Sequence, residues 1–145
     1  MARRAPLKLI AKGLMPASGD VLLDTSVVIP YFKGDRAVHT QLQASAKLHL
    51  PQTVLGELIC GAHLSTNPAR TLAEVQNFLK AVVVLSPGVT TAEHYGRIRA
   101  DLAKAGTPIP ENDIWIAALA LEHDLPLAAR DAHFDRISGL QVLKW

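Results

Sequence analysis

Four acidic residues stand inside or beside strongly apolar stretches of the chain, where an isolated charge is unfavourable: Asp24, Glu57, Asp113 and Asp131. A carboxylate removed from water is costly unless it is paired, hydrogen-bonded or bound to a metal ion. Because the four acids are spread over the whole chain, they predict one shared acidic pocket. We expect that pocket to be the functional site.

Repulsion between the carboxylates of such a pocket indicates which ligand the pocket would bind. Two carboxylates about 4 Å apart repel by roughly 4 kcal/mol at an effective dielectric of about 20. Three or four together protonate or splay apart unless a divalent cation neutralises them. Ligation by carboxylate oxygens suits Mg²⁺ or Mn²⁺ rather than zinc. Such ions bind phosphates and activate water.

Each acid also has a plain structural interpretation. Asp24 and Asp131 each precede a helical segment and could be N-caps, and Asp113, in a first helical turn, suits the helix dipole. Glu57 lies within a helical segment that is apolar nearly all round, so we expect it to be buried. Its alternative role is a salt bridge to a distant arginine.

The elements that must position these acids alternate along the chain from Val21 onward. Apolar and β-branched runs predict strands over residues 21–24, 48–50, 81–85, 125–129 and 140–143. Helices are predicted over residues 25–32, 35–46, 51–64, 68–80, 91–105 and 112–123, with a helical turn at 132–137. Strands separated by helices predict an α/β fold with a parallel sheet.

This order places the acids at one edge of the predicted sheet. Asp24 and Asp131 follow strands, and the carboxyl ends of the strands are where open α/β sheets bind ligands. Glu57 and Asp113 lie on helices that could cover the same edge. The spacing therefore favours convergence of all four carboxylates.

Length and composition narrow the class of protein. A chain of 145 residues is expected to form one domain, and no apolar run approaches the ~20 residues that span a bilayer. The single cysteine, Cys60, excludes an intrachain disulfide and a zinc-type cysteine pair, and we expect it in the core. This usage indicates a reducing, cytoplasmic compartment. Aromatic residues make up 5% of the chain, and no stacking platform for single-stranded bases is evident.

The net charge of +2 is concentrated at one end of the chain. Residues 1–14 contain Arg3, Arg4, Lys8 and Lys12 and no acid, and the remainder holds 11 basic and 13 acidic residues, a net charge of −2. We predict a flexible basic arm over residues 1–20 and one folded domain over residues 21–145. The arm lacks the continuous apolar core of a secretory signal.

Several short motifs carry a resemblance to a known family. They are Leu22-Leu23-Asp24-Thr25-Ser26, Thr53-Val54-Leu55-Gly56-Glu57-Leu58 with Gly61 after it, Asn112-Asp113-Ile114-Trp115-Ile116-Ala117-Ala118, Arg130-Asp131-Ala132-His133-Phe134 and the closing Ile137-Ser138-Gly139-Leu140-Gln141-Val142. In order and spacing they resemble PIN-domain proteins, and more narrowly the VapC-type toxic ribonucleases of bacterial toxin–antitoxin modules. The resemblance covers roughly Val21 to Val142.

The resemblance implies a three-layer α/β/α sandwich with a mainly parallel central sheet, forming a PIN-like nuclease domain over residues 21–145. It also implies a catalytic set of acids around one or two Mg²⁺ or Mn²⁺ ions: Asp24, Glu57, Asp113 and Asp131. The first, third and fourth acids would be metal ligands, and Glu57 would complete the shell or act as the base.

Supporting residues also follow from the resemblance. Thr25 or Ser26 would form hydroxyl hydrogen bonds near the first acid, and Asn112 would orient the loop before the third. One position departs from the family pattern: where such proteins often carry Thr or Ser shortly before the fourth acid, this chain has Ala128-Ala129-Arg130. The sequence therefore does not show whether a hydrogen bond from this segment supports the metal-binding acids.

The implied activity is that of a metal-dependent endoribonuclease that hydrolyses tRNA, ribosomal RNA or messenger RNA, as the toxin of a toxin–antitoxin pair. The implied partners are a cognate antitoxin and a second copy of the chain, with the helix at 68–80 and the apolar helix around Cys60 as candidate contact surfaces. The alternatives are a non-catalytic PIN-like module that binds RNA or protein, and a structural role in a larger complex.

Two other enzyme classes lack their required residues. A phosphatase of the haloacid-dehalogenase type needs a second aspartate two residues after Asp24, where this chain has Ser26. A dinucleotide-binding oxidoreductase needs a Gly-x-Gly-x-x-Gly motif after the first strand, and the sequence has none there.

Further polar residues have simpler expected roles. We expect His133 to pack or cap near Phe134, because the six histidines show no metal-ligand spacing. Asp135 is expected to pair with Arg136 or Arg130. Candidate contacts to RNA phosphates are Arg130, Arg97, Arg99 and Lys33.

Overall fold

The computed structural model describes residues 19–145, and its centre is a five-stranded sheet. Every pair of neighbouring strands is parallel, as predicted. The strands are β1 (Val21–Leu23), β2 (Leu48–Pro51), β3 (Val82–Leu85), β4 (Leu127–Ala128) and β5 (Val142–Leu143). Their order is β3-β2-β1-β4-β5, so the first strand of the chain occupies the middle of the sheet.

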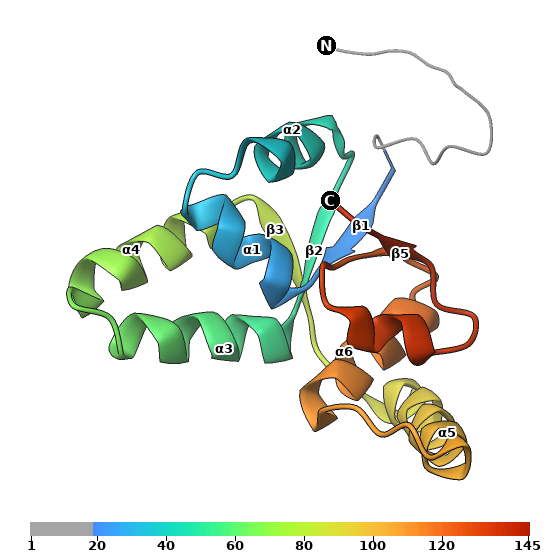
Figure 1. The fold of residues 1–145 in the computed structure, drawn as a ribbon. Helices are drawn as coiled ribbons and strands as arrows, with labels where there is room; N and C mark the ends of the chain where they lie inside the picture. The colour runs from blue at the N-terminus through green and yellow to red at the C-terminus, as the bar shows by residue number, and fades with distance from the viewer. Residues whose placement is uncertain (1–18) are drawn as a thin grey trace.

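Helices follow the strands and cover the sheet. They are α1 (Thr25–Phe32), α2 (Arg36–Ala44), α3 (Gln52–His63), α4 (Pro68–Leu79), α5 (Val89–Ala105) and α6 (Glu111–Glu122), with the 3₁₀ helix η1 at Ala132–Arg136. Figure 1 shows α1, α3 and α4 to the left of the strands, α2 above them, and α5 and α6 at the lower right. This arrangement confirms the predicted three-layer α/β/α sandwich.

The core includes the whole of β1 and the middle of α6. All three residues of β1 are buried, as expected for a central strand covered on both faces. In α6 the buried residues run from Ile114 to Ala120, with only Trp115 half-buried among them. Its small alanines allow the helix to approach the sheet closely.

The strand order decides where the polar residues lie. Because β1 lies between β2 and β4, the residues that follow β1 and β4 emerge side by side at the same edge. The backbone N–H of Asp24 donates to the carbonyl of Ala128 at 3.0 Å, which holds the two chain segments together at this edge. β4 is shorter than the predicted 125–129 strand, since its ladder to β1 extends only over Leu127 and Ala128.

Helix α3 turns a different face to the core than the sequence suggested. Val54, Leu58 and Ala62 are its buried residues and lie four positions apart, on one side of the helix. Glu57 and Cys60 are exposed, so the expectations that Glu57 is buried and that Cys60 belongs to the core are both wrong. Only one side of α3 packs against the core. Because the segment is apolar nearly all round, its sequence does not show which side that is.

The predicted basic arm over residues 1–20 lies almost wholly outside the described residues and stays a prediction, as does the division of the chain at residue 21. Within residues 19–145, no helix has the length and apolar character needed to cross a membrane.

Candidate metal centre

Asp24 is the most buried of the four predicted acids. It follows β1 and caps α1, and its carboxylate accepts hydrogen bonds from the backbone N–H of Ser26 at 3.0 Å and from the Ser26 hydroxyl at 2.6 Å. Only 5% of the residue is exposed. Burial raises the pKa of Asp24 above its ordinary value, although the Ser26 hydrogen bonds act in the opposite direction. The predicted cap is confirmed, and it coexists with an unfavourable buried charge.

Asp113 and Asp131 meet around a histidine. Nδ1 of His133 lies 3.0 Å from Oδ2 of Asp113 and 3.0 Å from Oδ1 of Asp131. A proton on Nδ1 would allow the ring to donate to these carboxylates, and a ring without that proton would offer Nδ1 as a metal ligand. Asp131 also caps η1 through the backbone N–H of His133, at 3.0 Å. These three side chains bring ligand atoms within 4.8 Å of one another, an arrangement that could hold a metal ion.

His133 is the residue that sequence reasoning missed. The expected packing or capping role is incomplete, because the His133 side chain also joins two carboxylates from different elements. The available signal was local: the histidine stands two residues after Asp131 in a motif already singled out. Spacing between histidines was the wrong test, because the partners are carboxylates rather than other histidines.

The pKa of Asp113 shows that these acids affect one another. Its pKa is raised, first by burial and then by the negative charges of Asp24 and Asp131, while the contact with His133 lowers it. Asp24, whose pKa is also raised by the charge of Glu57, therefore belongs to the same group of acids. Asp113 and Asp131 meet at His133, and Asp24 and Glu57 lie near enough for their charges to act on this group, while the shared functional site stays a prediction.

Glu57 lies at the open side of this group. Its Oε1 accepts a hydrogen bond from the Thr25 hydroxyl at 2.5 Å, and its Oε2 lies 3.5 Å from the side-chain nitrogen of Asn112. Both contacts come from residues predicted to support the site. The expected hydroxyl contact to the first acid is made by Ser26, whereas Thr25 and Asn112 contact Glu57.

The segment before Asp131 contacts the site through its main chain. The backbone N–H of Arg130 donates to the Ser26 hydroxyl at 2.9 Å, and that hydroxyl donates to Asp24. A serine from one end of the chain is thus held by a loop near the other end.

Two further polar residues have other partners than expected. Arg130 pairs with Asp35 at 3.1 Å, which lowers the pKa of Asp35. Asp135 pairs with Lys144 at 2.9 Å rather than with Arg136 or Arg130. In both cases the partner comes from another element, which a search among sequence neighbours cannot find.

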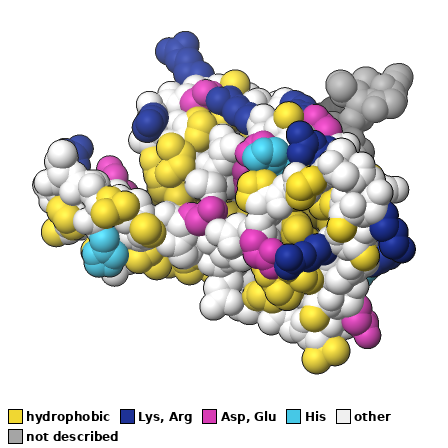
Figure 2. Space-filling view, turned by 60° about the horizontal axis from the view of Figure 1, so that its bottom comes forward, with side chains coloured by type: hydrophobic (Ala, Val, Ile, Leu, Met, Phe, Trp, Pro, Cys, Tyr) yellow, Lys and Arg dark blue, Asp and Glu magenta, His cyan; other side chains and the backbone are white. Residues whose placement is uncertain are grey.

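The donor set fits a divalent cation. Carboxylates whose pKa values are raised by burial and by one another carry unfavourable negative charge, and a bound cation would relieve it. The ligand atoms are mainly carboxylate oxygens, which suit Mg²⁺ or Mn²⁺. Figure 2 shows acidic side chains around a histidine near the centre of one face, with lysine and arginine side chains beside them.

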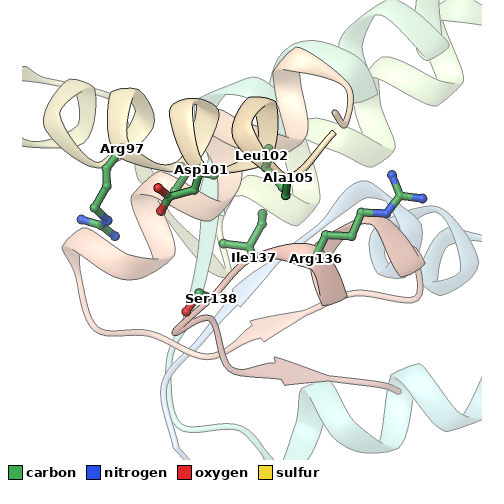
Figure 3. Close-up of a pocket in the computed structure, with 8 residues that line it drawn as sticks. Arg97, Asp101, Leu102, Ala105, Arg136, Ile137 and Ser138 are labelled. Carbon is green, nitrogen blue, oxygen red and sulfur yellow. The ribbon is translucent and has the colours of Figure 1, made fainter. Parts of the chain in front are cut away.

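A separate hollow of about 430 Å³ lies between α5 and the segment that begins at the end of η1. Figure 3 shows Arg97 and Arg136 at its two ends, with Asp101 on the α5 side. The Arg136 guanidinium donates to the carbonyl of Pro108 at 3.1 Å. None of the four predicted acids lines this hollow, so it is distinct from the acidic cluster.

Comparison with known proteins agrees with this geometry. A family model described as PIN domain matches residues 21–140. Ribonuclease VapC2 of Haemophilus influenzae is 33% identical over 127 residues, covering 86% of this chain and 96% of that protein. The tRNA(fMet)-specific endonuclease VapC of Shigella flexneri shows the same identity and coverage.

Solved structures give the same result. DNA-bound VapBC from Salmonella typhimurium has a TM-score of 0.82 and 32% identity, covering 87% of this chain and 98% of that chain. VapBC-1 from nontypeable Haemophilus influenzae has a TM-score of 0.80 and 30% identity over the same fractions. The chain belongs to the PIN-domain family, and within that family to its VapC-type members.

Proposed function

We propose that the protein is a metal-dependent endoribonuclease and the toxin of a toxin–antitoxin pair. The observation that carries the proposal is the meeting of Asp24, Asp113 and Asp131 at one sheet edge, with His133 between the last two. Such a cluster is costly to a protein that only binds RNA or another protein. The named activities of the VapC relatives support the same function.

In this proposal Asp24, Asp113 and Asp131 hold Mg²⁺ or Mn²⁺, and His133 orients the last two through its Nδ1–H. A bound ion supplies positive charge that offsets the charge of the phosphate, and it acidifies water. Ser26 keeps the Asp24 carboxylate in a single orientation.

Glu57 has the exposure that a proton acceptor needs. Its carboxylate is open to solvent and is oriented by the Thr25 hydroxyl and the Asn112 amide. We propose that Glu57 either takes the proton of the attacking water or completes the metal shell. Hydrolysis then transfers the water oxygen to phosphorus and breaks the phosphodiester bond, with the leaving oxygen becoming a hydroxyl.

The partners follow from the same proposal. The similar solved structures are VapBC proteins, so we propose a cognate antitoxin that covers the acidic site and a homodimeric enzyme, acting in the cytoplasm. The exposed side of α3 around Cys60 remains a candidate contact surface, together with Leu64 at its end, which is 82% exposed. Charge-reversal variants along α4 and size-exclusion chromatography would test these contacts.

The decisive experiment is cleavage of end-labelled tRNA and ribosomal RNA by the purified protein with Mg²⁺ or Mn²⁺, against an EDTA control. tRNA(fMet) is the first substrate to test, given the names of two relatives. Asp113→Asn should abolish cleavage, while Asp101→Asn, which changes an exposed acid of the separate hollow, should not. Wild-type cleavage by Asp113→Asn would refute the assigned site. Metal-independent RNA binding without cleavage would favour the non-catalytic module.

A further inference from the structure

Two aromatic rings that are far apart in the sequence stack on each other beside the acidic site. Tyr95 of α5 and Trp115 of α6 have ring centroids 4.1 Å apart and planes inclined by 19°. Tyr95 also packs against the hydrophobic core. Trp115 is not among the described side chains that pack against it. The sequence shows no evident stacking platform, and α5 and α6 bring together two rings that the sequence separates by twenty positions.

A polar frame fixes this pair of rings. The Tyr95 hydroxyl contacts the carboxylate of Glu111, and the Arg99 guanidinium donates to the Tyr95 hydroxyl at 2.7 Å and to Glu111 at 3.1 Å. The side chains of Arg99 and Glu111 are 61% and 52% exposed. The aromatic pair is thus held in place at the surface, with a cation at its margin.

Helix α6 connects these rings to the acidic site. Trp115 stands three positions after Asn112, so the two side chains lie on the same side of the helix, about one turn apart. Asn112 reaches Glu57, whereas Asp113 faces the other carboxylates. Trp115 therefore lies about one helical turn from the residue that contacts Glu57.

We infer that Trp115, supported by Tyr95, stacks an unpaired base of the RNA substrate next to the phosphate that the acidic site receives. This inference rests on the proposed function and adds a substrate-positioning residue to it. Unpaired bases stack on aromatic side chains, and a neighbouring guanidinium adds attraction to base or phosphate. Trp, Tyr and Arg are also enriched at protein–protein interfaces, so a contact between copies of the chain is the competing outcome that the tests below separate.

The kinetic test replaces the indole ring of Trp115 by another apolar side chain. Trp115→Leu should raise the KM for labelled tRNA about tenfold, the usual effect of losing one base stack, with kcat changed less than about twofold. Trp115→Phe keeps a ring and should restore most of the affinity. Tyr95→Leu, which removes the supporting ring, should give a smaller rise in KM. Circular dichroism would show that each variant is folded.

The direct test uses the fluorescence of Trp115. In a Trp145→Phe background, Trp115 is the remaining tryptophan, and stacking on a base should quench it. Titration with a 12-nucleotide single-stranded RNA, with Ca²⁺ in place of Mg²⁺ to limit cleavage, should give saturable quenching. An RNA of the same length built only from abasic nucleotides should give none. Equal quenching by both RNAs would overturn the inference.

The remaining outcomes separate this inference from the proposed function. Metal-dependent cleavage with identical KM in wild type and Trp115→Leu leaves the nuclease intact and overturns the stacking role. A Trp115→Leu variant that loses its oligomeric state in light scattering, yet binds RNA as wild type does, identifies the surface as a contact between copies and also overturns it. Absence of cleavage by the wild type refutes the proposed function, and the fluorescence titration then decides the stacking role alone.

Discussion

His133 Nδ1 lies 3.0 Å from Oδ2 of Asp113, although the two residues belong to different elements, η1 and α6. The contact ties the third and fourth acids of the site to each other. The predictions below follow from this arrangement and from the residues behind it.

Replacing His133 should weaken metal binding. His133→Ala leaves Asp113 and Asp131 without the group that orients them, so affinity for Mn²⁺ should fall about 10- to 100-fold, the range found when a partner behind a ligand is lost. Isothermal titration calorimetry measures this directly. His63→Ala, at the exposed end of α3, is the matched control. If His133→Ala bound Mn²⁺ as tightly as the wild type, the role of His133 would be confined to the cap of η1.

Asp113→Asn should stabilise the metal-free protein at neutral pH. Burial and neighbouring charges raise the pKa of Asp113 in the folded state, so between about pH 3.9, the ordinary value for aspartate, and that raised value the folded protein binds more protons than the unfolded one. The free energy of unfolding therefore decreases as pH rises through this window. Asparagine removes this decrease and still accepts a hydrogen bond from His133.

The measurement is urea denaturation of both proteins in EDTA at a series of pH values. The stability difference between Asp113→Asn and wild type should be largest at neutral pH and should shrink below about pH 3.9. Asp35 has a lowered pKa and contributes the opposite slope, but it is present in both proteins and cancels. A variant less stable than wild type at neutral pH would contradict the crowding of charge at Asp113.

Ser26→Ala should reduce both stability and activity. The hydroxyl donates to Asp24 and accepts from the Arg130 backbone N–H, so its loss removes one support of a metal ligand and leaves a backbone donor without its partner. We expect about 1–3 kcal/mol of destabilisation and about 10- to 100-fold slower cleavage. Ser45→Ala, which removes a hydroxyl bonded to the carbonyl of Gln41, is the control and should leave cleavage unchanged.

Glu57→Gln should separate activity from stability. Because Glu57 is exposed, its replacement by an isosteric amide should change the free energy of unfolding by less than about 0.5 kcal/mol. Loss of the carboxylate should reduce kcat by about 100-fold or more if it accepts the proton. Glu74→Gln on α4 is the matched control. Wild-type kcat in Glu57→Gln would exclude both roles proposed for Glu57.

Local sequence patterns were sufficient to locate the elements. The parallel sheet, the helices within a few residues of their observed bounds, and the caps at Asp24 and Asp131 all follow from apolar periodicity and from the residues preferred at helix starts. The order of acids along the chain also predicted a common edge, because residues that follow parallel strands emerge on one side of the sheet.

Tertiary structure decided which side chains meet. The stacking of Tyr95 on Trp115, the contact of His133 with Asp113 and the exposure of Glu57 depend on how helices cross and on which stripe of α3 faces the sheet. A periodic pattern specifies that one face of a helix is buried, and it does not specify the neighbour that buries it. Those contacts join residues distant in sequence, so they form only when the strand order β3-β2-β1-β4-β5 brings their elements together.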